Sequence, residues 1–519
     1  MAAPSGPGRE AEPVLATDEI QGSVLPGFRT PSQAFVFLEI VSAVRAGPWL
    51  RELRVTTLAD VLRSRGAAKS DATGDPWLNI ALTSAGLRKL LPRADGLTDV
   101  PLKQGMGRRS TLLGDPSAPD ADGSYDNWLI GGPETAVDVM LLIAGQDRGD
   151  VAAEVDRLRR GLPRGVRVVL VQFGQRPPPP DERREPFGFC DDISQPGIRG
   201  RLSDAPGDFL DPSTVPGDPV HARPGQVLVW PGEFVFGYPT QHPFDRLRPG
   251  LRSHGGPDWT RNGSLLVFRR LRQDVAGFQA FVREAARRIA AEHPALDGVT
   301  PESVAAKLMG RWHSGAPLMT SPDTDRPDLG RDPARNNDFS YLARAGNRNA
   351  PDPHGLLCPR AAHIRRAYPR DSATPGLTEA SIERHRLLRR SIPFVDRRGD
   401  VEEQGLLFLA YQTSIERQFE FVTRAWLNNP HLHDTDDGHD PIAGQSFGTR
   451  GDRSRIFSLR VPSADGDEER VILRLPHDWV VPTGGAYLFA PAVSTVRVLG
   501  ASVDGPSGKP REAPPQPSR

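Results

Sequence analysis

The chain has 519 residues, of which 37% are hydrophobic and 25% are charged, with 65 basic residues against 65 acidic ones. This balance excludes a strong overall field that would attract nucleic acid or an anionic membrane, so neither is expected as a partner. The two cysteines, Cys190 and Cys358, exclude a disulfide framework and are too few to hold a zinc ion or an iron–sulfur cluster unaided.

The two ends of the chain are rich in proline, glycine and charged residues. Residues 1–17 and 502–519 are therefore predicted to be disordered. The first residues lack the basic and apolar regions of a secretory leader, and no apolar run approaches the roughly 18 residues that span a bilayer. A cytoplasmic protein with no membrane contact is expected.

Residues 18–180 are predicted to form a first domain. Strands are expected at residues 35–41, 137–144 and 166–173. A helix over residues 150–162 is indicated by apolar residues at helical spacing, namely Val151, Val155, Leu158 and Leu162. The tetraproline at residues 177–180, followed by a charged run, marks the end of this domain.

Residues 181–501 are predicted to form a second domain on the same plan. Strands are expected near residues 226–230, 264–271 and 486–489, with a helix over residues 274–293 that Asp274 caps. A large irregular insertion is expected over residues 317–385, and loops of that length are usually functional. Strand, helix and strand, seen twice, predict an α+β fold of two ferredoxin-like domains with antiparallel sheets and peripheral helices.

Asp191 stands in the segment Gly-Phe-Cys-Asp-Asp-Ile-Ser-Gln-Pro at residues 188–196. Apolar surroundings raise the pKa of a carboxyl group toward the range in which it both gives and takes a proton. From this segment alone, a turn aspartate that caps its own backbone is the favoured interpretation.

His363 stands in the segment Cys-Pro-Arg-Ala-Ala-His-Ile-Arg-Arg-Ala-Tyr-Pro-Arg at residues 358–370. Four arginines surround it, at positions 360, 365, 366 and 370. Such cations are expected to depress the pKa of His363 and keep it in the neutral form that coordinates a metal, and guanidinium groups also suit the propionates of a haem. A buried core histidine and a solvated arginine face remain open as alternatives.

Arg389 stands in the segment Leu-Leu-Arg-Arg-Ser-Ile-Pro-Phe at residues 387–394, ahead of the apolar run at residues 405–412. An arginine held against apolar segments needs a polar or charged partner, because an unpaired buried charge is costly. An exposed arginine on a strand edge is the alternative.

Together the three segments resemble one family. GFxDxxSQP, CPxAAHIRRxxPR and RRSIPF followed by GLLFLAYQ, in this order, are similar to the dye-decolorizing peroxidases of the larger class found in fungi and actinobacteria. The likeness runs from about Ile20 to Leu499 and includes the segments at residues 20–28, 79–83, 232–239, 310–312 and 336–339. It implies a dimeric α+β barrel fold, one b-type haem per chain, hydrogen peroxide and an aromatic reductant such as a dye or phenolic as substrates, and a monomer or homo-oligomer.

The resemblance also implies a role for individual residues. His363 would be the iron ligand, Asp191 the distal acid–base residue and Arg389 the distal arginine. The other residues implied in haem binding are Ile193, Leu406, Phe408, Arg365, Arg370 and Asp440. Asp440 would accept a hydrogen bond from the proximal imidazole and fix its tautomer.

One residue departs from the pattern, because the family has glycine where this chain has Asp192. Its side chain is expected either to crowd the distal pocket or to raise the pKa of Asp191 by repulsion. This departure supports an alternative function, a haem-binding carrier, sensor or pathway protein with weak peroxidase turnover. A non-haem protein that retains only the fold is a third possibility.

Several other residues could have a functional role but also have an ordinary structural explanation. Tyr411 and Trp312 are candidates for electron transfer from bulky substrates, although buried aromatic residues usually belong to the core. Cys358 is a less favoured haem ligand than His363. A loop with His431, His433 and His439 among aspartates has no fixed metal-ligand spacing and is interpreted as a solvated loop.

Overall fold

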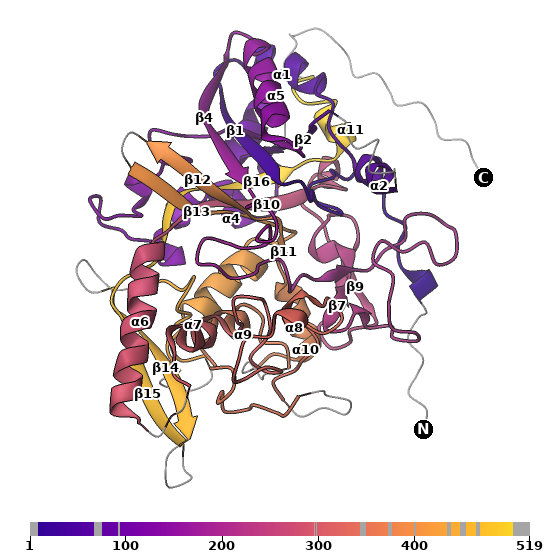
Figure 1. Cartoon of the computed structure of the whole chain (residues 1–519). Helices are drawn as coiled ribbons and strands as arrows, with labels where there is room; N and C mark the ends of the chain where they lie inside the picture. The colour runs from indigo at the N-terminus through magenta and orange to yellow at the C-terminus, as the bar shows by residue number, and fades with distance from the viewer. Residues whose placement is uncertain are drawn as a thin grey trace.

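A computed structural model describes residues 9–501 of the chain, with gaps (Figure 1). The gaps are residues 67–74, 92–93, 295, 297, 343–348, 372–375, 399–400, 433–436, 447–452 and 463–467. Residues 1–8 and the predicted tail at 502–519 lie outside the described residues.

A nine-stranded sheet forms the centre of the molecule. Its strands run in the order β11-β13-β10-β16-β2-β3-β1-β4, and β12 pairs with β13 beside β11. The first half contains β1 (Ser32–Ile40), β2 (Trp77–Leu82), β3 (Val139–Gly145) and β4 (Val166–Gln175). Almost every residue of β1 and β3 is buried, as expected of apolar strands covered on both faces.

The second half of the sheet repeats the antiparallel plan. It contains β10 (Ser264–Gln273), β11 (Leu388–Arg389), β12 (Ile392–Arg398), β13 (Val401–Gln412) and β16 (Val480–Ala490). The halves are joined where Phe489 of β16 pairs with Leu82 of β2. The predicted α+β fold with antiparallel strands is confirmed, and the predicted strands 35–41, 137–144, 166–173, 264–271 and 486–489 all fall on observed strands. The division into domains at residue 180 stays a prediction.

The sheet curls into a barrel. Phe268 of β10 contacts two rings of β1, Phe35 at 5.6 Å and Phe37 at 5.0 Å between centroids, although three strands separate β10 from β1 in the sheet. A flat sheet would hold these rings more than 15 Å apart, because neighbouring strands lie about 4.8 Å from each other. The interior of the barrel is therefore one packed core that both halves supply.

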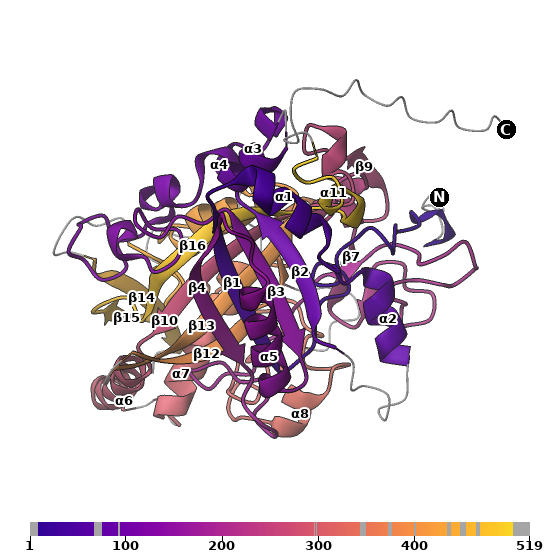
Figure 2. The same ribbon diagram turned by 90° about the horizontal axis from the view of Figure 1, so that it is seen from above.

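Helices cover the outside of the barrel. Figure 2 shows α5 (Arg148–Arg160) lying over β1 and β3, and α5 buries Val151, Val155 and Leu158 beneath it. Beside the second half, α6 (Val275–Glu292) packs against the hairpin of β14 (Arg455–Pro462) and β15 (Glu468–Leu475) (Figure 1). Both helices match the predicted ones, and Asp274 caps α6 by accepting a hydrogen bond from the backbone of Gly277.

The remaining elements are short. The helices are α1 (Ala43–Arg51), α2 (Leu58–Gly66), α3 (Ser84–Leu90), α4 (Val100–Gln104), α7 (Pro301–Met309), α8 (Pro327–Arg331), α9 (His363–Ala367), α10 (Glu379–Ile382) and α11 (Val493–Val496). The strands are β5 (Gly197–Ile198), β6 (His221–Arg223), β7 (Gln226–Val229), β8 (Pro239–Gln241) and β9 (Pro249–Arg252). Two π-helical stretches follow β13, at Glu416–Glu420 and Val422–Leu427. Turns of 3-10 helix occur at Arg9–Ala11, Ala94–Gly96, Gly107–Arg109, Thr111–Leu113, Tyr125–Asn127, Pro231–Glu233, Asp258–Thr260 and Glu383–His385.

The predicted insertion at residues 317–385 is largely irregular in its described part. Its helices α8, α9 and α10 have only four or five residues each. It has a small apolar core of its own, which includes Leu318, Phe339, Tyr341 and Cys358. This core holds α9 beneath the sheet (Figure 1).

The N-terminal segment differs from the predicted disorder. In residues 9–17, Leu15 is buried and Glu12 forms an ion pair with Arg199 at 2.9 Å. The prediction is therefore wrong for these residues, because partners far along the sequence supply the contacts that the local composition does not reveal. Within the described residues, no helix combines the length and the apolar character needed to cross a bilayer.

Candidate functional site

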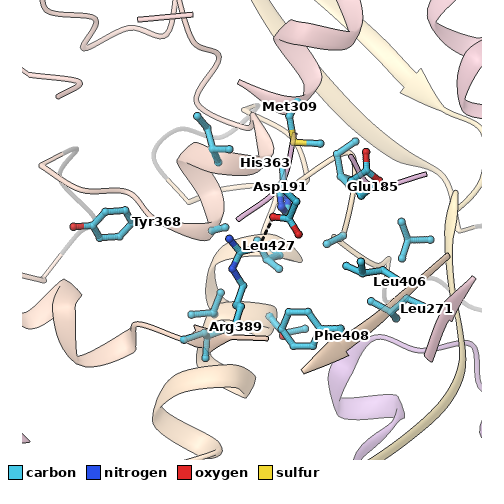
Figure 3. Close-up of a pocket in the computed structure, with 18 of the residues that line it drawn as sticks. Glu185, Asp191, Leu271, Met309, His363, Tyr368, Arg389, Leu406, Phe408 and Leu427 are labelled. Carbon is cyan, nitrogen blue, oxygen red and sulfur yellow. Dashed lines mark hydrogen bonds and ion pairs between the residues drawn. The ribbon is translucent and has the colours of Figure 1, made fainter. Parts of the chain in front are cut away.

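A cavity lies between the second half of the sheet and the segment that carries α9. The volume open to the centre of a water molecule is about 270 Å³. His363, Asp191 and Arg389 all line it. Figure 3 shows the carboxylate of Asp191 and the guanidinium of Arg389 pointing toward each other, with His363 close by. The fold thus brings the three sequence motifs to one cavity.

His363 is the first residue of α9, and its imidazole is held from behind. Nδ1 donates a hydrogen bond to Oδ2 of Asp440 at 2.8 Å, and Asp440 is fully buried. The other carboxylate oxygen accepts hydrogen bonds from the backbone of Ile442 and Ala443, each at 2.8 Å. The predicted contact between residues 363 and 440 is present, and Nε2 of His363 is left without a hydrogen bond to any described residue.

The pKa of His363 shifts in the direction opposite to the expectation. Burial lowers its pKa, but the carboxylate of Asp440 raises it by attraction and by the hydrogen bond, and the net shift of the pKa of His363 is upward. The prediction that the neighbouring arginines depress this pKa is wrong. Arg365 and Arg366 donate to other acceptors, and the arginine that does lower the pKa is Arg389, which lines the same cavity.

Arg365 does not line the cavity. It is fully buried, and its guanidinium donates to the carbonyl of Cys358 at 2.7 Å and to Asp352 at 3.2 Å. It also lies 4.3 Å from the centroid of the Tyr341 ring. The predicted contact with the haem therefore gains no support from the structure, because the carboxylate of Asp352 already pairs with the buried guanidinium.

Arg370 does line the cavity, in a strained backbone conformation with φ of 58°. Its guanidinium donates to the carbonyls of Asn337 and Phe339 and lies 4.0 Å from the Phe339 ring centroid. A second arginine, Arg386, also lines the cavity and lies 3.7 Å from the Tyr368 ring centroid. The sequence analysis missed Arg386, although it stands only three positions before Arg389.

Asp191 and Arg389 form an ion pair, with 3.1 Å between Oδ1 of the aspartate and Nη1 of the arginine. The same Oδ1 accepts a hydrogen bond from the backbone N–H of Asp192 at 2.6 Å. Burial alone would raise the pKa of Asp191, but the ion pair, this backbone hydrogen bond and the charge of His363 outweigh it, so its pKa is lowered. The expectation of a raised pKa is wrong, because the sequence did not reveal the partners.

Asp192 has a φ of 62°, in the left-handed region that glycine adopts without strain. Its carboxylate accepts a hydrogen bond from Nε2 of Gln195 at 2.8 Å. The side chain does not line the cavity of His363 but a neighbouring one. Neither expectation about Asp192 holds, since it does not crowd the distal pocket and the pKa of Asp191 is lowered rather than raised.

Apolar side chains form much of the cavity wall. Leu406 and Phe408, predicted for this role, project from the same face of β13 because they are two residues apart on one strand. Ile193 also lines the cavity, as predicted, next to Asp191. Further apolar lining residues, which the sequence analysis did not single out, are Leu271, Met309, Phe419, Val422, Leu427 and Ile442.

Glu185 is a second carboxyl group in the wall that the sequence analysis missed. It accepts hydrogen bonds from the backbone of Phe187 and Phe189, each at 3.0 Å, and from Nε2 of Gln273 at 2.7 Å. Burial raises the pKa of Glu185 to about 7. Its place in the turn that leads to Asp191 gives it a positioning role for that loop.

Other candidates from the sequence lie away from the cavity. Tyr411 and Trp312 are buried core residues. The hydroxyl groups of Tyr411 and Ser23 share a hydrogen bond, and Nε1 of Trp312 donates one to the carbonyl oxygen of Ser321. Cys358 is fully buried outside the cavity, and burial raises its thiol pKa to about 11, which disfavours the thiolate that a haem ligand needs.

The histidine-rich loop shows no metal centre in its described part. Within the described chain, no group of three or more histidine, cysteine or carboxylate side chains is arranged to hold a metal ion. His433 lies outside the described residues. Burial lowers the pKa of His439 to about 4. Of this segment, Asp440 is the residue that reaches the cavity site, through His363.

The donor set suits a haem. Nε2 of His363 is a nitrogen ligand whose orientation Asp440 fixes, the arrangement that metal-binding histidines usually have. The apolar wall offers contact to a macrocycle, and the guanidinium groups of Arg370 and Arg386 offer partners for its carboxylates.

Two family models match the chain. The "DyP dimeric alpha+beta barrel domain" matches residues 19–177, and "Dyp-type peroxidase, C-terminal" matches residues 309–447. A dye-decolorizing peroxidase of Mycena epipterygia is 30% identical over 519 residues, with 94% of this chain and 88% of the relative covered.

Solved structures are similar over the whole fold. An ancestral D-type dye-decolorizing peroxidase superposes with a TM-score of 0.75 at 30% identity, covering 93% of this chain and 99% of the other. A dye-decolorizing peroxidase in complex with 2,6-dimethoxyphenol superposes with a TM-score of 0.70 at 25% identity, covering 93% and 99% of the two chains.

Proposed function

The chain belongs to the dye-decolorizing peroxidase family and is a haem peroxidase, and we propose that it binds one b-type haem, with His363 as the iron ligand and with Asp191 and Arg389 as the residues that activate hydrogen peroxide. This assignment is supported by two polar features that meet in one largely apolar cavity. The first is His363 with its hydrogen bond to Asp440, and the second is the ion pair of Asp191 and Arg389.

His363, Arg370 and Arg386 would hold the cofactor, with Leu406 and Phe408 packing against it. When bound, the haem supplies the redox chemistry that reduces peroxide and oxidises the substrate. The hydrogen bond to Asp440 keeps the proton of the imidazole on Nδ1, so that Nε2 faces the cavity with its lone pair.

Asp191 would serve as the acid–base residue. The ion pair with Arg389 favours the ionised form of the carboxyl group, which is the form that accepts the proton of hydrogen peroxide. The proton is then delivered to the departing oxygen, which leaves as water. Arg389 lies 3.1 Å from this carboxylate and would donate hydrogen bonds where negative charge develops as the O–O bond breaks.

The reducing substrates proposed are dyes and phenolic compounds. The relatives are named for dye decolorization, and one similar structure contains 2,6-dimethoxyphenol. The alternative of a haem carrier or sensor with weak turnover rested on Asp192. Because the Asp192 side chain lies outside the cavity of His363, that support is lost.

The test combines a spectrum with turnover. We expect the purified protein to show a Soret band and to oxidise a phenol or anthraquinone dye when peroxide is added. Asp191→Asn and Arg389→Leu are each expected to lower kcat/KM for peroxide by about 100-fold or more, the usual worth of acid–base or electrostatic assistance, with the Soret band retained. Asp126→Asn and Arg45→Gln, at exposed positions, serve as matched controls. Full turnover in both Asp191→Asn and Arg389→Leu would contradict the assignment.

A further inference from the structure

A second cavity lies next to the cavity of His363. The volume open to the centre of a water molecule is about 420 Å³, larger than that of its neighbour. The two cavities share Asp191, Ile193 and Arg389 in their walls. The ion pair of Asp191 and Arg389 therefore lies in the wall that separates the two cavities.

Positive charge dominates the second cavity. Six arginines line it besides Arg389, namely Arg29, Arg65, Arg176, Arg183, Arg223 and Arg390. The carboxylates in the same wall are those of Asp191, Asp192 and Asp211. Seven arginines and three aspartates thus line one cavity, although the charge of the whole chain is balanced.

The three carboxylates do not neutralise this excess. Asp191 pairs with Arg389, Asp192 accepts from Gln195, and Asp211 accepts from the backbone of Ile198 at 2.8 Å. None of these contacts uses one of the other six arginines.

The six arginines have weak partners or none. Arg183 and Arg390 donate to backbone carbonyls alone, and Arg65 donates to the carbonyl of Gly27. The side chains of Arg29, Arg176 and Arg223 form no hydrogen bond or ion pair with any described residue. Arg29 and Arg223 are exposed and are attracted by Asp211, so a ligand can reach them from solvent. Burial, together with repulsion from Arg29 and Arg390, lowers the pKa of Arg65 to about 10, although Asp211 acts in the opposite direction.

The wall also has an apolar part. Leu25, Phe28, Leu62, Leu210 and Leu388 line the same cavity. A site with guanidinium groups beside apolar side chains matches a ligand that has an oxyanion at one end and an apolar body at the other.

We propose that this second cavity is a binding site for a small oxyanion-bearing molecule, with a carboxylate, sulfonate or phosphate group held by Arg29, Arg176 and Arg223. An inorganic oxyanion and the anionic group of an aromatic compound share this chemistry, and the experiment below separates them. Binding itself is independent of turnover. One consequence rests on the proposed function: an anionic reductant bound beside the pair of Asp191 and Arg389 has a lower KM than its neutral analogue.

Binding is measured by calorimetric titration of the purified haem-loaded protein with 2-naphthalenesulfonate at low salt. The triple variant Arg29→Gln, Arg176→Gln and Arg223→Gln is expected to bind the probe at least tenfold more weakly. Arg29, Arg176 and Arg223 do not line the cavity of His363, so the Soret band of the triple variant is expected to stay unchanged. A matched triple, Arg45→Gln, Arg164→Gln and Arg283→Gln, removes the same charge from exposed positions and is expected to bind within twofold of the unaltered protein.

Two further probes identify the source of the anion. Neutral 2-naphthamide is expected to bind at least tenfold more weakly than the sulfonate. If sodium sulfate displaces the probe at equal affinity, the site takes inorganic oxyanions, and if sulfate binds much more weakly, the apolar wall selects aromatic anions. The proposal is overturned if the sulfonate shows no saturable binding, or if both triple variants lose affinity equally. A missing Soret band would instead count against the proposed function.

Discussion

At the scale of single residues, the site depends on partners that fix the state of each functional group. Asp440 orients His363, and Arg389 lowers the pKa of Asp191. Both partners come from segments distant in the sequence. Their effects can therefore be tested one side chain at a time.

Removing the carboxylate behind His363 is expected to weaken cofactor binding. In Asp440→Ala, Nδ1 of His363 loses its acceptor in a buried position, and haem affinity is expected to fall by about 10- to 100-fold. Transfer of haem to apomyoglobin measures this, with Asp126→Asn as the control at an exposed aspartate. Unaltered haem retention in Asp440→Ala would show that the hydrogen bond has no role in holding the cofactor.

Glu185 is expected to make the free energy of unfolding fall as the pH rises. Its folded pKa is about 7 against an ordinary value of 4.5, so the folded state binds the proton more tightly than the unfolded state. This contribution to stability is fully present below pH 4.5 and is lost as the pH rises through about 7. In Glu185→Gln, the free energy of unfolding should fall less steeply between these pH values, as urea titrations at several pH values would show. Identical slopes in the two proteins would contradict the prediction.

Substitutions at Asp192 test whether the backbone there keeps its left-handed conformation in solution. With φ at 62°, a β-branched residue is disfavoured while glycine is not. Asp192→Val is expected to lower the free energy of unfolding by about 1–2 kcal/mol relative to Asp192→Gly. Urea denaturation compares the two, and equal stability would mean that this backbone conformation relaxes in solution.

At the scale of elements, the position of His363 depends on how α7 packs against α9. Gly310 ends α7 with φ of 90°, and a Cβ atom added there would lie 2.5 Å from Cγ1 of Ile364, the neighbour of His363. Glycine is therefore required both by the backbone and by the contact.

Gly310→Ala separates these two requirements when compared with Gly217→Ala. Gly217 also has a positive φ, of 75°, in a turn closed by the hydrogen bond from Asp218 to Val215, but an added Cβ would meet nothing within 4 Å. Both variants should lose about 1 kcal/mol from the backbone, while Gly310→Ala should lose about 1–3 kcal/mol more by overpacking and should also retain less haem. Denaturation and haem content per chain measure the two effects, and equal losses in both variants would refute the role of the contact between α7 and α9.

The sequence predicted regular elements better than side-chain partners. Apolar spacing located β1, β3, β4, β10, α5 and α6, because burial on one or both faces imposes a pattern that is visible locally. Arg365 and Arg370 looked alike within one arginine-rich segment, yet the first is held by Asp352 and the second lines the cavity. Their difference depends on a carboxylate and a strained backbone that only the tertiary structure contains.

The residues of the site that stand in family motifs could be predicted from the sequence. His363, Asp191 and Arg389 were found together because three motifs occur in one order, and the fold places them in one cavity. Glu185 and Arg386 stand close to these motifs but were missed, since nothing in the residues themselves showed that they face inward. The pKa of Asp191 was predicted in the wrong direction for the same reason.

At the scale of the whole molecule, the curled sheet unites both halves of the chain in one core. Phe268 of the second half packs on Phe35 and Phe37 of the first. The two halves are therefore expected to unfold together rather than as independent units.

Phe268→Ala tests this coupling. Truncating a fully buried ring is expected to lower stability by about 3–5 kcal/mol, and calorimetry should show one transition that moves to a lower temperature as a whole. Phe244→Ala, at an exposed ring, is the control and should leave the transition in place. Two separate transitions, with only one of them shifted, would contradict a shared core.

The absorption spectrum of His363→Ala shows whether His363 is the ligand of a haem, the assignment on which the proposed function depends. His254→Ala, at an exposed histidine, is the control. We expect His363→Ala either to lose haem or to show a displaced Soret band, which added imidazole shifts back, while His254→Ala keeps the original spectrum. A His363→Ala protein with full haem content and an unchanged Soret band would contradict it.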